Sequence, residues 1–235
     1  MRLELPSGLV VRGFTPPLRL ADFRLAAFDM DSTLIDIECI DEIAAAVGLK
    51  AEVAAITEAT MRGEIADFRD SLRQRLALLK GVDEKWLHEV WEHRLHLNPG
   101  VETFLAALRD AGLKTLLVSG GFTFFSDRVA RRLAIDDTRA NRLEIVDGAL
   151  TGGLVMQPWG DICDGAEKRR MLLQTCTELG IAPAQAIAVG DGSNDLPMME
   201  AAGLSIAYHA KPAVRAQAML AINEGGMDGA LAVLR

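Results

Sequence analysis

Two aspartates separated by a single residue, Asp29 and Asp31, stand at the end of a short apolar run. Residues 24–28 before them are mostly apolar and too few for a helix, which is typical of a strand covered on both faces. Because side chains alternate along a strand, both carboxylates start on the same side. Two such acids cost desolvation and mutual repulsion unless a cation or a reaction requires them. A strand running into an Asp-Ser-Thr turn or helix cap is the alternative, and the pair alone favours neither interpretation.

Polar residues also follow two other apolar runs of the same kind. Ser119, Gly120 and Gly121 follow one of them, and residues 190–195 (GDGSND) follow the other. Lys168 precedes the second run, at the start of a predicted helix. Each feature alone is ordinary turn, cap or surface chemistry. Their joint occurrence at several strand ends favours a functional site, because open α/β sheets bind ligands at the carboxyl ends of their strands.

The residue types in this group suit a phosphate ester and a divalent metal. Hard carboxylate oxygens for Mg²⁺ would come from Asp29, Asp191 and Asp195. Donors to the phosphoryl oxygens would come from Ser119, Gly120, Gly121 and Lys168. Attack of a carboxylate on phosphorus would give an aspartyl-phosphate. Asp31 can protonate the leaving oxygen and later take a proton from the hydrolytic water.

The elements that must position these residues alternate along most of the chain. Strand-like runs are expected at 24–28, 114–119, 186–190, 204–208 and 218–223. Helical patterns lie between them at 101–111, 123–133, 167–179, 196–202 and 227–234. This alternation predicts an α/β fold with a Rossmann-like, largely parallel sheet and helices on both faces. A β-hairpin is expected over 141–155, around Asp147-Gly148, and a short edge strand among the first twenty or so residues.

One segment breaks the alternation. Residues 38–96 are rich in Ala, Leu, Glu and Arg and read as amphipathic helices at 41–47, 51–61, 66–79 and 84–94. An ordinary helical layer on one sheet face is the alternative to a cap. We favour an inserted helical-bundle cap (38–96) over an α/β core (1–37 and 97–235), because the insert leaves the strand just after the paired acids.

Composition narrows the class of partner. The formal net charge of −8 argues against general affinity for nucleic acid or anionic membranes. Neither a bilayer-spanning apolar run nor the apolar segment of a secretory signal is present in the sequence. Its three cysteines are odd in number and lack metal-ligand spacing, so they are expected to be buried apolar residues in a cytoplasmic protein. A monomer or a homodimer is equally compatible with these features.

The four groups of chemical residues resemble the motifs of the haloacid dehalogenase (HAD) superfamily in type, order and placement. They are residues 29–33 (DMDST), residues 119–121 (SGG), Lys168 and residues 190–195. The resemblance implies that Asp29 is the nucleophile and Asp31 the acid/base. It also implies Mg²⁺ held by Asp29, the backbone carbonyl of Asp31 and Asp191. Asn194 and Asp195 are implied to support the phosphate and metal site.

The likeness extends to the phosphoserine phosphatase family and covers nearly everything after residue 23. It rests on residues 38–44, 61–64, 71–75, 119–125, 140–143, 191–198 and 206–212. It implies that Glu38 and Arg75 bind the ammonium and carboxylate of the substrate, with Met61 and Phe68 lining the pocket. An arginine can grip a carboxylate with two hydrogen bonds, so the residue types agree with this role. Outside this context Glu38 and Arg75 would be read as a solvated helix face.

The sequence departs from that family in two places. One extra residue precedes Phe68 in the run 61–68, which weakens the expected role of Phe68 more than that of Arg75. The segment before the first strand is also too short for the amino-acid-sensing domain of some longer family members. Inhibition by serine through such a domain is therefore not expected.

The resemblance implies Mg²⁺-dependent hydrolysis of O-phospho-L-serine to L-serine and phosphate, a step of serine biosynthesis. Transfer of the phosphoryl group to another hydroxyl, such as that of homoserine, and hydrolysis of another small phosphomonoester remain as alternatives. A receiver-like phospho-aspartate switch is an alternative from a different class. Asp31 argues against the switch, because a lasting phospho-aspartate gains nothing from an acid/base two residues away. The helical insert also favours an enzyme that closes over a small substrate.

Overall fold

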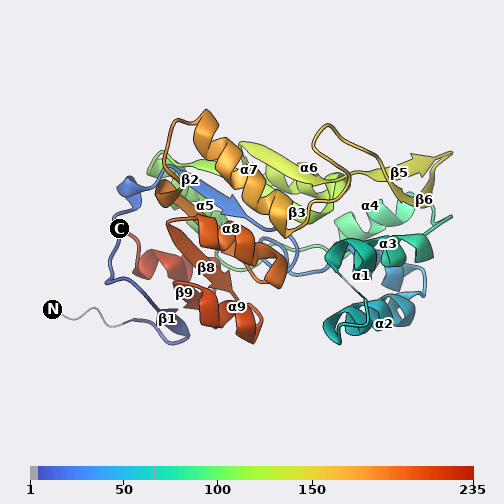
Figure 1. The fold of residues 1–235 in the computed structure, drawn as a ribbon, viewed down its shortest axis with the longest axis horizontal. Coiled ribbons are helices and arrows are strands. Elements are labelled where there is room, and N and C mark those ends of the chain that lie inside the picture. The colour runs from blue at the N-terminus through green and yellow to red at the C-terminus, as the bar shows by residue number, and fades with distance from the viewer. Residues whose placement is uncertain (1–4, 66) are drawn as a thin grey trace.

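A seven-stranded sheet forms the centre of the computed structural model, which describes residues 5–65 and 67–235 (Figure 1). Its order is β1-β9-β8-β7-β2-β3-β4. The strands are β1 (Leu9–Val11), β2 (Leu25–Phe28), β3 (Lys114–Phe122), β4 (Asp137–Asn141), β7 (Ala186–Gly190), β8 (Leu204–Tyr208) and β9 (Leu220–Ile222). All neighbouring pairs are parallel except β1 with β9. The predicted parallel sheet and N-terminal edge strand are therefore confirmed.

Helices cover both faces of the sheet, which explains why β2 is apolar at every position. Phe28 points into a core shared with α5 (Val101–Asp110) and α6 (Thr123–Leu133). Ala27 points into the opposite core, which includes residues of α7 (Gly165–Glu178), α8 (Leu196–Ala201) and α9 (Pro212–Gln217). Alternate side chains of one strand thus enter two different cores, and a strand buried on both faces needs an unbroken apolar run.

Four helices inserted between β2 and β3 gather at one end of the sheet (Figure 1). They are α1 (Cys39–Ala46), α2 (Lys50–Met61), α3 (Phe68–Leu78) and α4 (Lys85–His93), and we call them the inserted helices. The hairpin of β5 (Leu143–Val146) and β6 (Ala149–Leu154) lies against them. Backbone hydrogen bonds join the loop after α3 to this hairpin, from Gly81 N to Leu150 O (2.7 Å) and from Leu150 N to Val82 O (2.8 Å).

The hairpin turn follows from its sequence. Asp147 and Gly148 have φ angles of 51° and 75°, the left-handed conformation that a two-residue hairpin turn requires. Asp-Gly is among the dipeptides that adopt this turn most readily, so the predicted hairpin is confirmed. Its first residue, Asn141, instead ends β4 of the main sheet.

Three short elements differ from the sequence-based expectation. The edge strand β4 (DTRAN) is mostly polar and was not predicted, because it pairs only with β3 and carries no apolar run. The six-residue α9, which begins at Pro212, was not predicted either. Residues 227–234 form a 3-10 helix over Met227–Ala232 rather than an α-helix.

The remaining structural expectations concern burial and membranes. Cys39, Cys163 and Cys176 are free and buried, as expected of small apolar side chains. Within residues 5–65 and 67–235, no helix combines the length and the apolar composition needed to cross a bilayer.

Candidate active site

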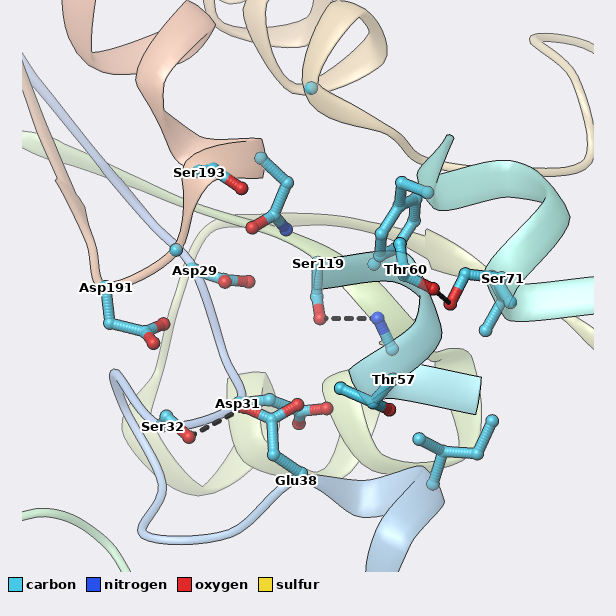
Figure 2. Close-up of a pocket in the computed structure, with 18 of the residues that line it drawn as sticks. Asp29, Asp31, Ser32, Glu38, Thr57, Thr60, Ser71, Ser119, Asp191 and Ser193 are labelled. Atoms are coloured by element: carbon cyan, nitrogen blue, oxygen red, sulfur yellow. Dashed lines mark hydrogen bonds between the residues drawn. The ribbon is translucent and has the colours of Figure 1, made fainter. Parts of the chain in front are cut away.

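The predicted chemical residues meet at the carboxyl ends of three adjacent strands. In the sheet β2 lies between β7 and β3. Asp29 follows β2, Ser119 lies near the end of β3, and Asp191 follows β7, so segments far apart in the chain are brought together. They line a cavity of about 660 Å³ that the inserted helices close from the other side. Figure 2 shows Asp29 and Asp191 on one wall and Thr57, Thr60 and Ser71 of the inserted helices on the opposite wall.

A cluster of carboxylates occupies the floor of this cavity. One oxygen each from Asp29, Asp191 and Asp195 lie within 4.8 Å of one another. The ammonium group of Lys168 is fully buried and lies 2.7 Å from both Asp29 Oδ1 and Asp195 Oδ1. Three acids thus share a single buried lysine, which leaves an excess of negative charge.

Asp195 is held in place by the loop that carries it. Its Oδ2 accepts hydrogen bonds from the backbone N–H groups of Asp191 (3.0 Å) and Gly192 (2.9 Å). A Cβ at position 190 would collide with the Asp195 carboxyl group, so the close approach requires glycine there. Both oxygens of Asp195 therefore already have partners inside the protein, Lys168 on one and the loop on the other.

Burial and crowding shift the pKa values of the acids on the cavity floor. Burial, and then the nearby Asp195, raises the pKa of Asp29 well above its usual value, although Lys168 opposes the shift. The same two causes raise the pKa of Asp191 to about 7. Burial would lower the pKa of Lys168, but Asp195 and Asp29 raise it, so the lysine stays charged. The chemistry of this donor set suits a divalent cation, whose charge would balance the surplus acids.

Asp31 lies beside the cluster with an incomplete set of hydrogen bonds. Its Oδ2 accepts the backbone N–H of Cys39 at 3.2 Å, while its Oδ1 is buried with no hydrogen-bond partner among the described residues. Burial, and then the neighbouring Glu38, raises the pKa of Asp31 to about 7. The carboxyl group can therefore both donate and accept a proton near neutral pH.

The next residue turns the chain toward the inserted helices. Ser32 has a φ of 56°, and its hydroxyl donates a 2.7 Å hydrogen bond to Glu38 Oε1 (Figure 2). This contact fixes one carboxylate oxygen of Glu38 just before the start of α1. The acid predicted to meet the substrate's ammonium group is thereby tied to the loop that carries Asp31.

Residues 119–121 form an irregular loop within β3, where its pairing with β4 shifts register between Val118 and Phe122, and they provide donors and a hydroxyl. Ser119 is buried, and its hydroxyl oxygen accepts the backbone N–H of Gly121 at 2.8 Å. The side chain of Asn141 donates to the carbonyl of Gly120 at 2.6 Å and accepts the N–H of Cys163 at 2.6 Å. Asn141 thus joins this loop to the segment that leads into α7 and Lys168.

Asn141 and Lys211 are among the residues at the site that sequence reasoning missed. Asn141 lay within residues 140–143, which were noticed only as a resemblance, and its link to Gly120 depends on the unpredicted strand β4. Lys211 lines the cavity, and its backbone N–H donates to the carbonyl of Asp191 at 3.2 Å. A lone lysine after β8 carried no signal of its own.

The inserted helices bring further predicted residues to the cavity. Glu38, Phe68 and Arg75 all line it, as does Asn194 from the opposite wall. The ring of Phe68 covers Gly120 so closely that a Cβ there would lie 2.8 Å from Phe68 Cζ. The extra residue before Phe68 therefore does not displace its ring from the cavity. The side chain of Met61 lies outside the described part of the structure.

Ion pairs join the inserted helices to the segment that leads into α7. Arg69 of α3 lies 2.8 Å from Asp161 Oδ1 and 2.9 Å from Asp164 Oδ2, and Arg73 lies 2.9 Å from Asp161 Oδ2. Asp164 also caps α7 by accepting the N–H of Glu167 at 3.0 Å. The helix that carries Arg75 is in this way connected to the helix that carries Lys168.

Comparison with known proteins agrees with the fold. Residues 23–203 match the haloacid dehalogenase-like hydrolases. That span contains β2, β3 and β7 and all of the predicted site residues. The chain therefore belongs to the haloacid dehalogenase-like hydrolase family.

Individual relatives narrow the comparison. The chain is 66% identical over 232 residues to a phosphoserine phosphatase of Polaromonas sp., covering 99% of this chain and 98% of the relative. It is also 66% identical to a phosphoserine phosphatase of Albidiferax ferrireducens, over 94% of this chain and 93% of the relative. A solved structure described as a phospho-aspartyl intermediate analogue of phosphoserine phosphatase superposes with a TM-score of 0.83 at 34% identity, over 91% of this chain and 99% of that one. Within the hydrolase family, the relatives are phosphoserine phosphatases.

Proposed function

We propose that this protein hydrolyses O-phospho-L-serine to L-serine and phosphate through an aspartyl-phosphate. The observation that carries the proposal is that one cavity holds two recognition centres. Asp29 and Ser119, with Lys168 buried directly behind Asp29, suit a phosphate ester, and Glu38 and Arg75 of the same cavity suit an amino acid. The relatives that cover almost the whole chain carry the same activity in their names.

In the proposed reaction the carboxylate of Asp29 attacks phosphorus and the P–O bond to the serine oxygen breaks. Asp31 gives its proton to that oxygen and then accepts a proton from the water that cleaves the aspartyl-phosphate, which regenerates Asp29 and releases phosphate. Lys168, the hydroxyl of Ser119 and the N–H groups of the Gly120-Gly121 loop stabilise charge on the phosphoryl oxygens.

We further propose that the cation is Mg²⁺, held by Asp29, Asp191 and the backbone carbonyl of Asp31. It would supply positive charge that reduces repulsion between the attacking carboxylate and the phosphate. Asp195 acts indirectly in this arrangement, because Lys168 and two backbone N–H groups occupy its oxygens. This role differs from direct ligation, which the sequence suggested for Asp195.

The charge surplus predicts that Mg²⁺ stabilises the protein more at pH 8 than at pH 5. Without metal, the folded pKa of Asp31 and Asp191 is about 7 against 3.8 unfolded. Because their pKa is raised, the two carboxyl groups hold protons in the folded state that they release in the unfolded state. Their contribution to the free energy of unfolding is therefore complete below pH 3.8 and is lost as the pH rises through about 7. Mg²⁺ would restore part of this stability, because it would bind the ionised carboxylate of Asp191 and its charge would offset that of Asp31. At one hundred times its Kd, Mg²⁺ should raise the melting temperature at pH 8 by about 5–10 °C.

The control for that measurement is Asp191→Asn, which should lose most of the Mg²⁺-dependent rise at pH 8. An equal rise at pH 5 and pH 8, or an undiminished rise in the variant, would contradict the proposed cation site.

The proposed substrate is tested by a panel of phosphate esters. Phosphoserine should be hydrolysed with a higher kcat/KM than phosphothreonine or a small phosphosugar, and only with Mg²⁺ present. Addition of homoserine tests the alternative acceptor, because phosphohomoserine would form at the expense of free phosphate. A phosphosugar that outperforms phosphoserine would overturn the proposal.

We also propose that two parts of the chain have different roles. The inserted helices, together with their connections over residues 38–96, act as a cap that selects the substrate, and the sheet with its flanking helices performs the chemistry. The ion pairs of Arg69 with Asp161 and Asp164 support this division, because they join the two parts at the rim of the cavity. We place the enzyme in the cytoplasm, where its three free cysteines are stable.

A further inference from the structure

One acid of the cavity has no role in the mechanism above. Asp41 lies on α1, three residues after Glu38, and both line the cavity. Glu38 is the extended residue that precedes α1, and the nearby charge of Asp41 contributes to raising its pKa, so the two carboxylates lie near each other. Arg75 of α3 lines the same part of the cavity and is the largest favourable charge acting on Asp41.

These three charged groups line one cavity and lie close enough for their charges to interact, yet they form no ion pair among the described residues. Arg75 pairs with neither Glu38 nor Asp41 among the described residues, and its hydrogen bond runs from Nε to the carbonyl of Ser71 at 3.4 Å. Opposite charges that are partly shielded from water usually pair, because a shielded donor or acceptor is costly to leave unpaired. The space between them therefore suits a ligand with a charge of each sign.

Asp41 differs from its acidic neighbours in its hydrogen bonding. Glu38 is held by the hydroxyl of Ser32 at 2.7 Å, and Glu42 is paired with Arg94 at 3.0 Å. Asp41 Oδ1 is buried and has no hydrogen-bond partner among the described residues. Burial raises the pKa of Asp41, and Arg75 and Lys50 offset this only in part. The carboxylate thus lacks a positively charged donor on the cavity side.

We propose that Asp41 is a second specificity residue, whose carboxylate accepts a hydrogen bond from the α-ammonium group of the substrate alongside Glu38. This inference rests on the proposed function. An α-ammonium group carries three N–H donors, more than one carboxylate oxygen can satisfy. The α-carboxylate is attached to the same carbon and faces Arg75, so a zwitterion fills the gap between the acid pair and the guanidinium group.

A purely structural role for Asp41 makes a different prediction. If Asp41 only oriented Arg75, its loss would weaken recognition of the carboxylate rather than of the ammonium group. Three substrates separate these roles. Phosphoserine has both groups, 3-phosphoglycerate has a hydroxyl in place of the ammonium group, and phosphoethanolamine has the ammonium group but lacks the carboxylate.

The test is kcat/KM of Asp41→Asn for the three substrates. The variant should lose about 10–100-fold on phosphoserine and on phosphoethanolamine, as expected for a charge-assisted hydrogen bond, and less than about two-fold on 3-phosphoglycerate. Arg75→Ala provides the opposite pattern, with losses on phosphoserine and 3-phosphoglycerate only. Asp70→Asn, an exposed acid of α3, is the matched control and should match the wild type on all three.

Two results would overturn the inference. One is an undiminished kcat/KM of Asp41→Asn for phosphoserine, and the other is an equal loss on phosphoserine and 3-phosphoglycerate. A wild-type enzyme without preference for phosphoserine over 3-phosphoglycerate would instead refute the proposed function, and the inference with it. Because the substitution removes a buried charge without a partner, the substrate-free variant should melt no lower than the wild type. The variant Asp41→Ser, which has a smaller side chain, repeats the comparison of kcat/KM for the three substrates.

Discussion

Replacement of Asp29 by asparagine is expected to lower phosphoserine turnover at least about 10⁴-fold, the order found when a nucleophile is removed from an enzyme. An amide oxygen is a poor nucleophile and cannot form the aspartyl-phosphate. The fold should survive, because the amide oxygen can still accept the hydrogen bonds that Asp29 Oδ1 receives from Met30 N–H (2.7 Å) and Lys168 (2.7 Å). Steady-state kinetics and thermal unfolding measure the two effects separately.

The matched control is Asp110→Asn, a change of the same size at an exposed site on α5. It should leave both turnover and melting temperature unchanged. Retention of phosphatase activity by Asp29→Asn would refute the assignment of Asp29 as the nucleophile.

Replacement of Asp31 by asparagine is expected to slow phosphoserine turnover by about 10²–10⁴-fold, the usual contribution of a general acid or base. Asparagine keeps the backbone carbonyl proposed to meet the metal, and its amide oxygen can replace Oδ2 as acceptor for the N–H of Cys39. It cannot hold or release a proton. Burial and Glu38 raise the pKa of Asp31 to about 7, which suits a group proposed to release and take up a proton near neutral pH.

An aryl phosphate separates the two proton transfers of Asp31. Its leaving group departs without protonation, so Asp31→Asn should release a rapid burst of about one phenolate per active site. Turnover should then stall, because no base activates the water that cleaves the phospho-enzyme. Asp29→Asn should show no burst. Steady hydrolysis at a near wild-type rate, without a burst, would count against the role of Asp31.

The sequence predicted the catalytic centre because its signals are local. The strands β2, β3 and β7 each contain a short apolar run, and polar residues follow that run within β3 and directly after β2 and β7. Alternation of strands and helices restricts the connections to those of a parallel sheet. Residues at the carboxyl ends of neighbouring strands then meet without any need to know their side-chain contacts.

Features that depend on one side chain meeting another far along the chain were not predictable. Asn141 lies on a polar edge strand, and its hydrogen bond to the Gly120 carbonyl spans 21 residues. The ion pair of Arg69 with Asp164 spans 95 residues. In the sequence, Asn141 and Arg69 look like ordinary surface residues. They differ from surface residues only in the partners that they meet in the folded chain.

The sequence by itself determined the sheet, the inserted helices and the set of residues able to carry out phosphoryl chemistry. It did so because apolar periodicity and strand-end motifs are written in consecutive residues. The tertiary structure decided how the charges are shared. It placed Lys168 between Asp29 and Asp195, occupied both oxygens of Asp195, and left Asp41 Oδ1 buried without a partner among the described residues. Electrostatic energies depend on distance and burial, and only the folded chain sets either of them.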